Sequence, residues 1–111
     1  MSEIERPTPK SARMDAGYGR EPREMIDATA RAVSRLPGWN LVNSEDNVLR
    51  AVRMTRLLRF KDDITVRAYP GARPDHSRLE IHSASRLGKS DLGQNPRNLQ
   101  ELTGALESEL G

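Results

Sequence analysis

The fold is decided by residues 60–86, FKDDITVRAYPGARPDHSRLEIHSASR, where two runs of β-forming residues flank one loop. Apolar and polar side chains alternate through residues 60–69 and again through residues 78–86, which is the pattern of a strand with one buried face. The inward residues are Ile64, Val66, Ala68, Leu79 and Ile81. Proline and glycine in residues 70–75 predict a loop between the runs. This stretch therefore predicts two consecutive strands paired antiparallel.

Two further strands are predicted before this pair, at residues 39–43 and 48–57, with a polar turn between them. Helices are predicted on either side of the four strands. The first spans residues 22–36, where a proline occupies the first helical position and apolar residues recur at helical spacing. The second spans residues 96–110, with Asn95 as its N-cap.

Consecutive strands joined by short turns form an antiparallel meander, and two amphipathic helices can cover only one of its faces. We therefore predict an α+β fold, a two-layer sandwich with a four-stranded antiparallel meander sheet and an N-terminal and a C-terminal helix packed on one face. A chain of 111 residues has room for one core, so residues 22–111 are expected to be a single domain. Residues 1–21 are polar and contain prolines and glycines, which predicts a disordered or extended polar tail.

Strand parity determines which polar side chains meet. When the inward apolar residues of the two runs pair, Asp62 falls opposite Ser85 on the helix-covered face, and Asp63 falls diagonal to Arg86 on the open face. A buried Asp62 needs hydrogen bonds, because each unmet polar group costs about 1 to 3 kcal/mol. We expect Asp62 to hold the following connector and the last helix to the sheet. The alternative is a general base or ligand with a perturbed pKa.

The connector at residues 83–94, SASRLGKSDLGQ, is almost entirely small, polar or charged. Its Gly-Lys-Ser sequence is similar to the end of a phosphate-binding P-loop. The first glycine of that motif would fall at Ser83, however, and Gly93 and Pro96 prevent a helix from beginning at the lysine. We therefore expect a capping loop in which Asp91 closes an Asx turn, with an anion nest as the alternative.

The net charge of +2 conceals an uneven distribution, because positive side chains are concentrated between Asn47 and Arg97 while the rest of the chain is net acidic. Most of the cations are arginine, which favours bidentate contacts with carboxylate or phosphate. The open sheet face would carry Lys61, Arg67, His82 and Arg86. Platforms that bind RNA stack bases on aromatic residues, and this chain has few of them, so we do not expect a nucleic acid partner.

The chain has no cysteine, which excludes disulfides and thiolate metal sites. His76 and His82 lack convergent carboxylates, so we expect them at the surface and predict neither a metal nor another cofactor. No stretch approaches the roughly 20 apolar residues of a membrane span, and the start of the chain has no apolar core of a signal peptide. We therefore expect a soluble, cytoplasmic protein.

Three stretches carry a resemblance to a known family, namely Pro37-Gly38-Trp39, Phe60-Lys61-Asp62-Asp63 and the segment from Ser83 to Asn95. Together they resemble the family catalogued as domain of unknown function 1499, and the last stretch is the most specific. The resemblance covers about residues 22–110. It implies the same fold and the same site, and no particular reaction, cofactor or partner. Members often carry a cysteine-bearing segment and a membrane or export signal, which the cysteine-free, polar start of this chain does not match.

These observations converge on one candidate polar corner, made of Asp62, Ser85, Arg86, Lys89, Ser90, Asp91 and Asn95. We predict a non-catalytic binding or protein-interaction module whose partner is a second copy or another protein. The alternative is a small enzyme or anion-binding domain in which Asp62 acts as base or ligand while Arg86 and Lys89 hold a negatively charged group. An accessible corner with unsatisfied donors would favour this alternative, whereas a buried and fully hydrogen-bonded Asp62 would favour the binding module.

Overall fold

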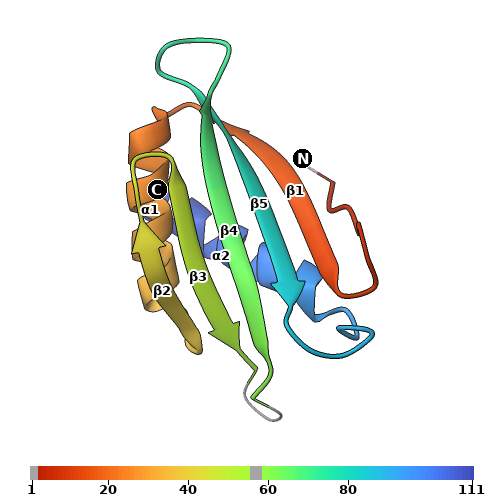
Figure 1. Ribbon diagram of the computed structural model, residues 1–111. Helices are drawn as coiled ribbons and strands as arrows, with labels where there is room; N and C mark the ends of the chain where they lie inside the picture. Colours follow the sequence, from red (N-terminus) through yellow and green to blue (C-terminus); the bar gives the residue numbers. More distant parts are fainter. Residues whose placement is uncertain (1–2, 56–58) are drawn as a thin grey trace.

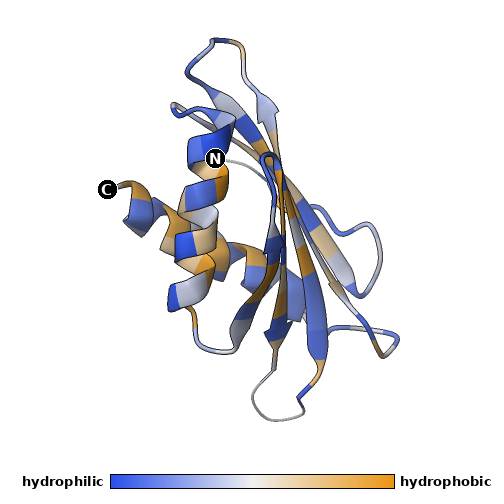
Figure 2. Cartoon of the chain, turned by 60° about the vertical axis from the view of Figure 1, so that its left-hand side comes forward, coloured by the Kyte–Doolittle hydropathy of each residue, from blue (hydrophilic) through white to orange (hydrophobic). Residues whose placement is uncertain are grey.

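The computed structural model of the chain describes residues 3–55 and 59–111. Within these residues, five strands form one antiparallel sheet and two helices cover one of its faces (Figures 1 and 2). The elements are β1 (Ser11–Tyr18), α1 (Pro22–Arg35), β2 (Trp39–Ser44), β3 (Val48–Met54), β4 (Lys61–Pro70), β5 (Ser77–Ser85) and α2 (Gln94–Leu110). The predicted α+β class with an antiparallel sheet and two helices is confirmed.

The order of strands in the sheet is β1-β5-β4-β3-β2, so the expected meander is present in β2 to β5. The predicted count of four strands was wrong, because β1 adds a fifth strand at the edge beside β5 (Figure 1). This strand pairs antiparallel with β5 from Ser11 opposite Ala84 to Tyr18 opposite Ser77. The expectation of a tail over residues 1–21 is thereby corrected for residues 11–18.

Strand β1 forms because alternate residues have apolar side chains that face the helices. Ala12 is fully buried and Met14 is 8% exposed, while Ala16 and Tyr18 pack against the same core. The backbone groups of β5 gain partners along their otherwise unpaired edge. Small side chains and Gly17 conceal this alternation in the sequence. Residues 1 and 2 of the expected tail lie outside the described residues.

The helices and inner strands agree closely with the expected ranges. Helix α1 begins at Pro22 as predicted, and Gly38, with φ of 82°, then turns the chain into β2. A side chain there would meet backbone, since a Cβ on Gly38 would lie 3.0 Å from the carbonyl oxygen of Met54. Strand β3 ends at Met54, and residues 56 and 57 of the strand predicted at residues 48–57 lie outside the described residues.

The start of α2 differs from its prediction. The helix begins at Gln94, its N-cap is Gly93 with φ of 81°, and Asn95 lies inside the first turn instead of capping it. Asn95 is fully buried. From the first turn of α2, its side-chain amide reaches the Ser85 hydroxyl at the end of β5. The expected N-cap at Asn95 is therefore corrected, and the consequence is a polar side chain directed into the interior.

The core lies between the sheet and the two helices, where Figure 2 shows apolar residues on the facing sides of the layers. Its largest fully buried apolar side chains are Met25, Ile26, Val33, Leu49, Ile64, Val66, Leu79, Ile81, Leu99, Leu102 and Leu106. The other face of the sheet is not covered by either helix (Figure 2). In the described residues, neither helix has the length and apolar character needed to cross a membrane.

Candidate functional site

The candidate polar corner lies at the end of the sheet where β4 begins, β5 ends and α2 begins (Figure 1). The strand register that the sequence predicts is confirmed, since Asp62 pairs with Ser85 and Ile64 with Ser83. Asp62 and Ser83 are buried on the helix-covered face. Two adjacent strands and one helix therefore direct polar side chains towards one point.

Asp62 is a buried acidic residue of the corner, with 1% exposure. Its Oδ1 accepts a hydrogen bond of 2.8 Å from the Ser85 hydroxyl, and its Oδ2 accepts one of 2.8 Å from the Asn98 side-chain amide. No cationic group of the described residues lies within 4.0 Å of this carboxylate. Neutral donors thus stabilise a buried acid that has no ion-pair partner in the described residues.

Asn95 connects the remaining groups of the corner. Its amide nitrogen lies 2.9 Å from the Ser85 hydroxyl, 2.7 Å from Oδ2 of Asp91 and 2.8 Å from the carbonyl oxygen of Lys10. The Ser83 hydroxyl donates to its amide oxygen at 2.6 Å. Because Ser85 in turn donates to Asp62, Asn95 joins the acidic group on β4 to the first turn of α2 and to the chain just before β1.

Asp91 forms the Asx turn that the sequence predicts, because its Oδ1 accepts a hydrogen bond of 2.8 Å from the Gly93 amide. The same oxygen accepts a 2.8 Å charge-assisted bond from Arg6. Burial alone would raise the pKa of the Asp91 carboxyl. Hydrogen bonds from the Asn95 side chain, the Gly93 amide, Arg6 and the Asn95 amide outweigh it and lower this pKa below its ordinary value of 3.8.

The cationic residues of the predicted site do not join the buried cluster. Arg86 is directed to the open face of the sheet, where Nε and Nη2 bind both oxygens of Asp63 at 2.8 to 3.1 Å. Lys89 is exposed and has no acidic group within 4.0 Å among the described residues. Ser90 is in the exposed loop, where its hydroxyl accepts a 3.3 Å bond from the Leu92 amide. The structure therefore brings together Asp62, Ser85, Asp91 and Asn95, and separates Arg86 and Lys89 from them.

A cavity of about 210 Å³ opens beside the corner, and Asp62 and Ser85 contribute to its wall. Its other lining residues include three apolar side chains that are exposed, Phe60 at 47%, Leu87 at 70% and Leu92 at 84%. Leu92 also has a left-handed backbone conformation, with φ of 53°, which costs a residue with a Cβ about 1 to 2 kcal/mol. Neither burial nor backbone preference accounts for leucine at this position.

Two contributors to the corner escaped the sequence reasoning. Asn98 binds Asp62 from the second turn of α2, and its signal was present, because Asn95 and Asn98 are spaced three apart beside the apolar stripe of that helix. Arg6 binds Asp91 from the segment before β1. No local pattern indicates that contact, since it depends on β1 returning to the far edge of the sheet.

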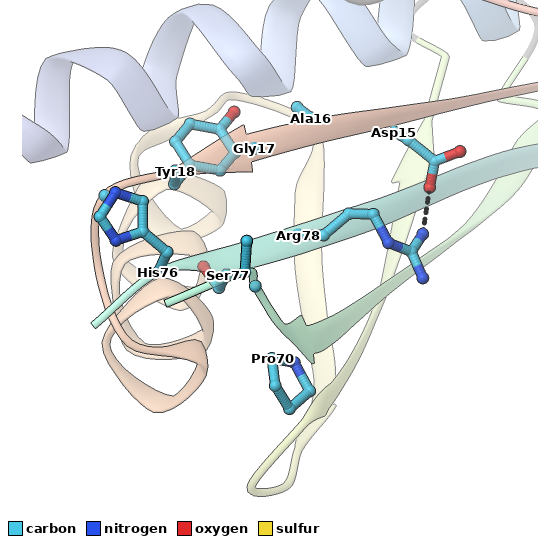
Figure 3. A pocket seen from close by; sticks show the side chains of 11 residues that line it. Asp15, Ala16, Gly17, Tyr18, Pro70, His76, Ser77 and Arg78 are labelled. Carbon is cyan, nitrogen blue, oxygen red and sulfur yellow. Dashed lines mark hydrogen bonds and ion pairs between the residues drawn. The ribbon is translucent and has the colours of Figure 1, made fainter. Parts of the chain in front are cut away.

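A second cavity, of about 580 Å³, lies at the opposite end of β1 and β5 (Figure 3). Its labelled side chains include Tyr18, His76 and Ser77, together with Arg78, which forms a 2.6 Å bond with Asp15. The exposed His76 ring contacts Asp75 at 2.9 Å, and this hydrogen bond lowers the pKa of Asp75. In the described part of the chain, no three acidic or histidine side chains are grouped closely enough to hold a metal ion.

The fold and the corner define a small two-layer α+β domain with a buried polar cluster between the sheet and the start of its last helix. The chain belongs to the family described as protein of unknown function (DUF1499), which matches residues 3–106. The match includes β1 and the segment that supplies Arg6. The comparison with curated proteins found no match.

Two solved structures are similar to this chain at low sequence identity. A protein from Rhodobacter sphaeroides is similar with a TM-score of 0.57 and 10% identity, over 99% of this chain and 95% of the other. A protein from Thermus thermophilus matches with a TM-score of 0.48 and 11% identity, over 89% of this chain and 95% of the other. The first likeness supports the fold, and at such identity it says nothing about the site.

Proposed function

We propose that this protein is a non-catalytic binding module that accepts an apolar side chain of a partner protein in the cavity beside the polar corner. The observation that carries the proposal is the gathering of exposed Phe60, Leu87 and Leu92 around one concave site. Apolar side chains scattered singly over a surface are ordinary, whereas several around one cavity are typical of contact sites. We name these three residues the apolar rim.

The hydrogen bonds of the corner favour a binding role over a catalytic one. Both oxygens of Asp62 accept bonds from protein donors and the residue is 1% exposed, whereas a general base must come within hydrogen-bond reach of its substrate. The hydroxyl of Ser85 donates to Asp62, and that of Ser83 donates to Asn95. These groups are engaged in holding the loop and α2 in place, and that arrangement fixes the cavity beneath the apolar rim.

The anion-binding alternative receives less support from the geometry. Arg86 already binds a carboxylate on the open face, and that pair raises the pKa of Arg86 through its hydrogen bonds and charge attraction with Asp63. Lys89 is exposed and forms no ion pair with the described residues. We therefore assign the partner to protein, either a second copy of this chain or another protein. We also propose a cytoplasmic location, because a chain without cysteine has no need of an oxidising compartment.

The test replaces two leucines of the apolar rim at once, Leu87→Ser with Leu92→Ser. Both side chains are largely exposed, so the free energy of unfolding should change by less than about 0.5 kcal/mol. Wild-type and variant proteins are used to capture partners from cells, the captured proteins are quantified by mass spectrometry, and affinities are then measured with the purified candidate. At least one protein should bind the wild type and lose about tenfold or more in affinity for the variant.

The matched control is Leu41→Ser with Val42→Ser, which removes exposed apolar side chains from β2, at the opposite edge of the sheet from β1. This control should retain the partner. Loss of self-association in the rim variant alone would identify the partner as a second copy. Equal binding by wild type, rim variant and control would contradict the proposal.

A further inference from the structure

The uncovered face of the sheet has a row of polar side chains that crosses four strands. The register places Arg50 of β3 opposite Thr65 of β4, Thr65 opposite His82 of β5, and His82 opposite Arg13 of β1. Arg67 follows Thr65 by two residues on β4, so it lies on this face diagonal to Arg50. Figure 1 views the sheet from this side, with both helices behind it.

Each acidic side chain of this face already has cationic partners. Asp15 binds Arg13 at 2.9 Å and Arg78 at 2.6 Å. Glu80 lies 3.3 Å from the same Arg13. Asp63 accepts bonds on both oxygens from Arg86, as described above. These three carboxylates of the open face are thus already bound to arginine side chains of the same face.

Arg50 and Arg67 have no such partner. Among the described residues no carboxylate lies within 4.0 Å of either guanidinium group, although Glu80 is the direct cross-strand neighbour of Arg67. Arg50 is exposed and Arg67 is partly exposed. Like charges at neighbouring positions on one sheet face disfavour each other, and a bound anion removes that cost. The two arginines are therefore a cationic pair whose counter-charge is not supplied by the described part of the chain.

We infer that Arg50 and Arg67 form a binding site for an acidic segment of a partner protein, whose carboxylates the two guanidinium groups contact. The same face shows the contact geometry in the bidentate Arg86 to Asp63 pair. Thr65 is directly opposite Arg50 and two residues from Arg67 on the same strand, so it neighbours both arginine positions and offers a hydroxyl to the same ligand. This site is on the side of the sheet away from the helices, so it is independent of the apolar rim.

Other anionic partners fit this face less well. Single-stranded nucleic acid needs free aromatic faces, and the ring of Tyr69 is covered by the Arg78 guanidinium, 4.4 Å from its centroid. The phosphates of a nucleic acid backbone would extend past the arginine pair to Asp63 and Glu80, whose negative charges would repel them. A short acidic segment needs to contact only the two arginines. A second copy docked through this face would place cationic side chains against each other.

The experiment measures the affinity of the full chain for a fluorescent oligoglutamate peptide at low and physiological salt. Wild type should bind, and added salt should weaken the binding. The double variant Arg50→Gln with Arg67→Gln should lose about tenfold in affinity, because both charge-assisted contacts to the peptide carboxylates are removed from a partly exposed site. Circular dichroism of the variant checks that both replacements leave the fold intact.

The control, Arg59→Gln with Arg73→Gln, removes the same charge from exposed positions outside the strands and should stay within about twofold of wild type. Equal affinities of the two double variants would overturn the inference, because the binding would then follow net charge. Duplex DNA and phosphatidylserine vesicles are the comparison ligands. Tighter binding of either one than of oligoglutamate, with loss in the Arg50 and Arg67 variant, would overturn the assignment to an acidic protein segment.

Discussion

At the scale of single residues, Asp62 and Asp63 show how one position of offset along a strand separates two identical groups. Asp62 is directed towards the helices and is 1% exposed, while the side chain of Asp63 is 51% exposed on the other face. The first accepts bonds from neutral buried donors, and the second forms an ion pair with Arg86. We expect the hydrogen bonds of Asp62 to contribute more to the stability of the fold than the ion pair of Asp63. If Asp62 were removed, its buried donors would have no water molecule to accept their hydrogen bonds.

We expect Asp62→Ala to lower the free energy of unfolding by about 3 kcal/mol. The replacement leaves the Ser85 hydroxyl and the Asn98 amide without an acceptor, and each unmet buried group costs about 1 to 3 kcal/mol. Urea denaturation followed by circular dichroism measures the change. Asp63→Ala is the control and should cost less than about 1 kcal/mol, since exposed ion pairs contribute little. Equal effects of the two replacements would show that the corner does not stabilise the fold.

The residues of the corner could be predicted to the extent that strand parity governs them. Alternation through residues 60–69 and 78–86 was enough to place Asp62 opposite Ser85 and to direct Arg86 towards Asp63. Parity could not place Asn95 and Asn98, because their contacts depend on the residue at which α2 begins. It also could not show that Lys89 would stay outside the buried cluster, since loop direction has no period.

At the scale of elements, β1 is the feature that changes the architecture. It extends the sheet beyond β5 and brings the segment before it to the polar corner, where the carbonyl oxygen of Lys10 accepts a bond from Asn95. The sequence underrated this strand because its apolar alternation is built from alanine and methionine among charged residues and glycine. Long runs of β-branched residues predict strands well. An edge strand made of small residues has little such signal, and it becomes evident mainly from the neighbouring strand with which it pairs.

Met14→Ala tests whether β1 is part of the core in solution. Met14 is 8% exposed and belongs to the core cluster, so the replacement should lower the free energy of unfolding by about 2 kcal/mol. Thermal and urea denaturation measure the loss. Glu3→Ala, an exposed position in the same part of the chain, should have no measurable effect. Stability unchanged by Met14→Ala would mean that the strand contributes nothing to the fold.

At the scale of the whole molecule, the ion pair between Arg6 and Asp91 joins two segments that are 85 positions apart in the chain. The pKa of Asp91 is lowered in the folded state because bonds from Asn95, Gly93 and Arg6 outweigh the effect of burial. A carboxyl with a lowered folded pKa adds stability that is complete above its unfolded value near 3.8 and is lost as pH falls through its folded value. Acid should therefore weaken the connection between the two segments.

We expect Asp91→Asn to destabilise the protein between pH 5 and 7 and to have a progressively smaller effect as the pH falls from 3.8 through the folded pKa of Asp91, because the wild-type carboxyl then loses its charge. Urea denaturation at a series of pH values measures the difference between wild type and variant. Arg6→Gln removes one of the donors, so its effect should have the same pH trend and a smaller size. A difference between wild type and Asp91→Asn that grows in acid would contradict this account of the pKa.

The pairing of β1 with β5 has a consequence for how the chain is made. On the ribosome β1 emerges before any other strand, yet its partner is complete only when residue 85 has left the exit tunnel, after β2, β3 and β4 have had time to pair with their neighbours. Closing a connection of that length is slow compared with forming a hairpin. We therefore expect the nascent sheet to grow from β2 towards β5 and to be completed by β1, which covers an edge that would otherwise be available to other nascent chains.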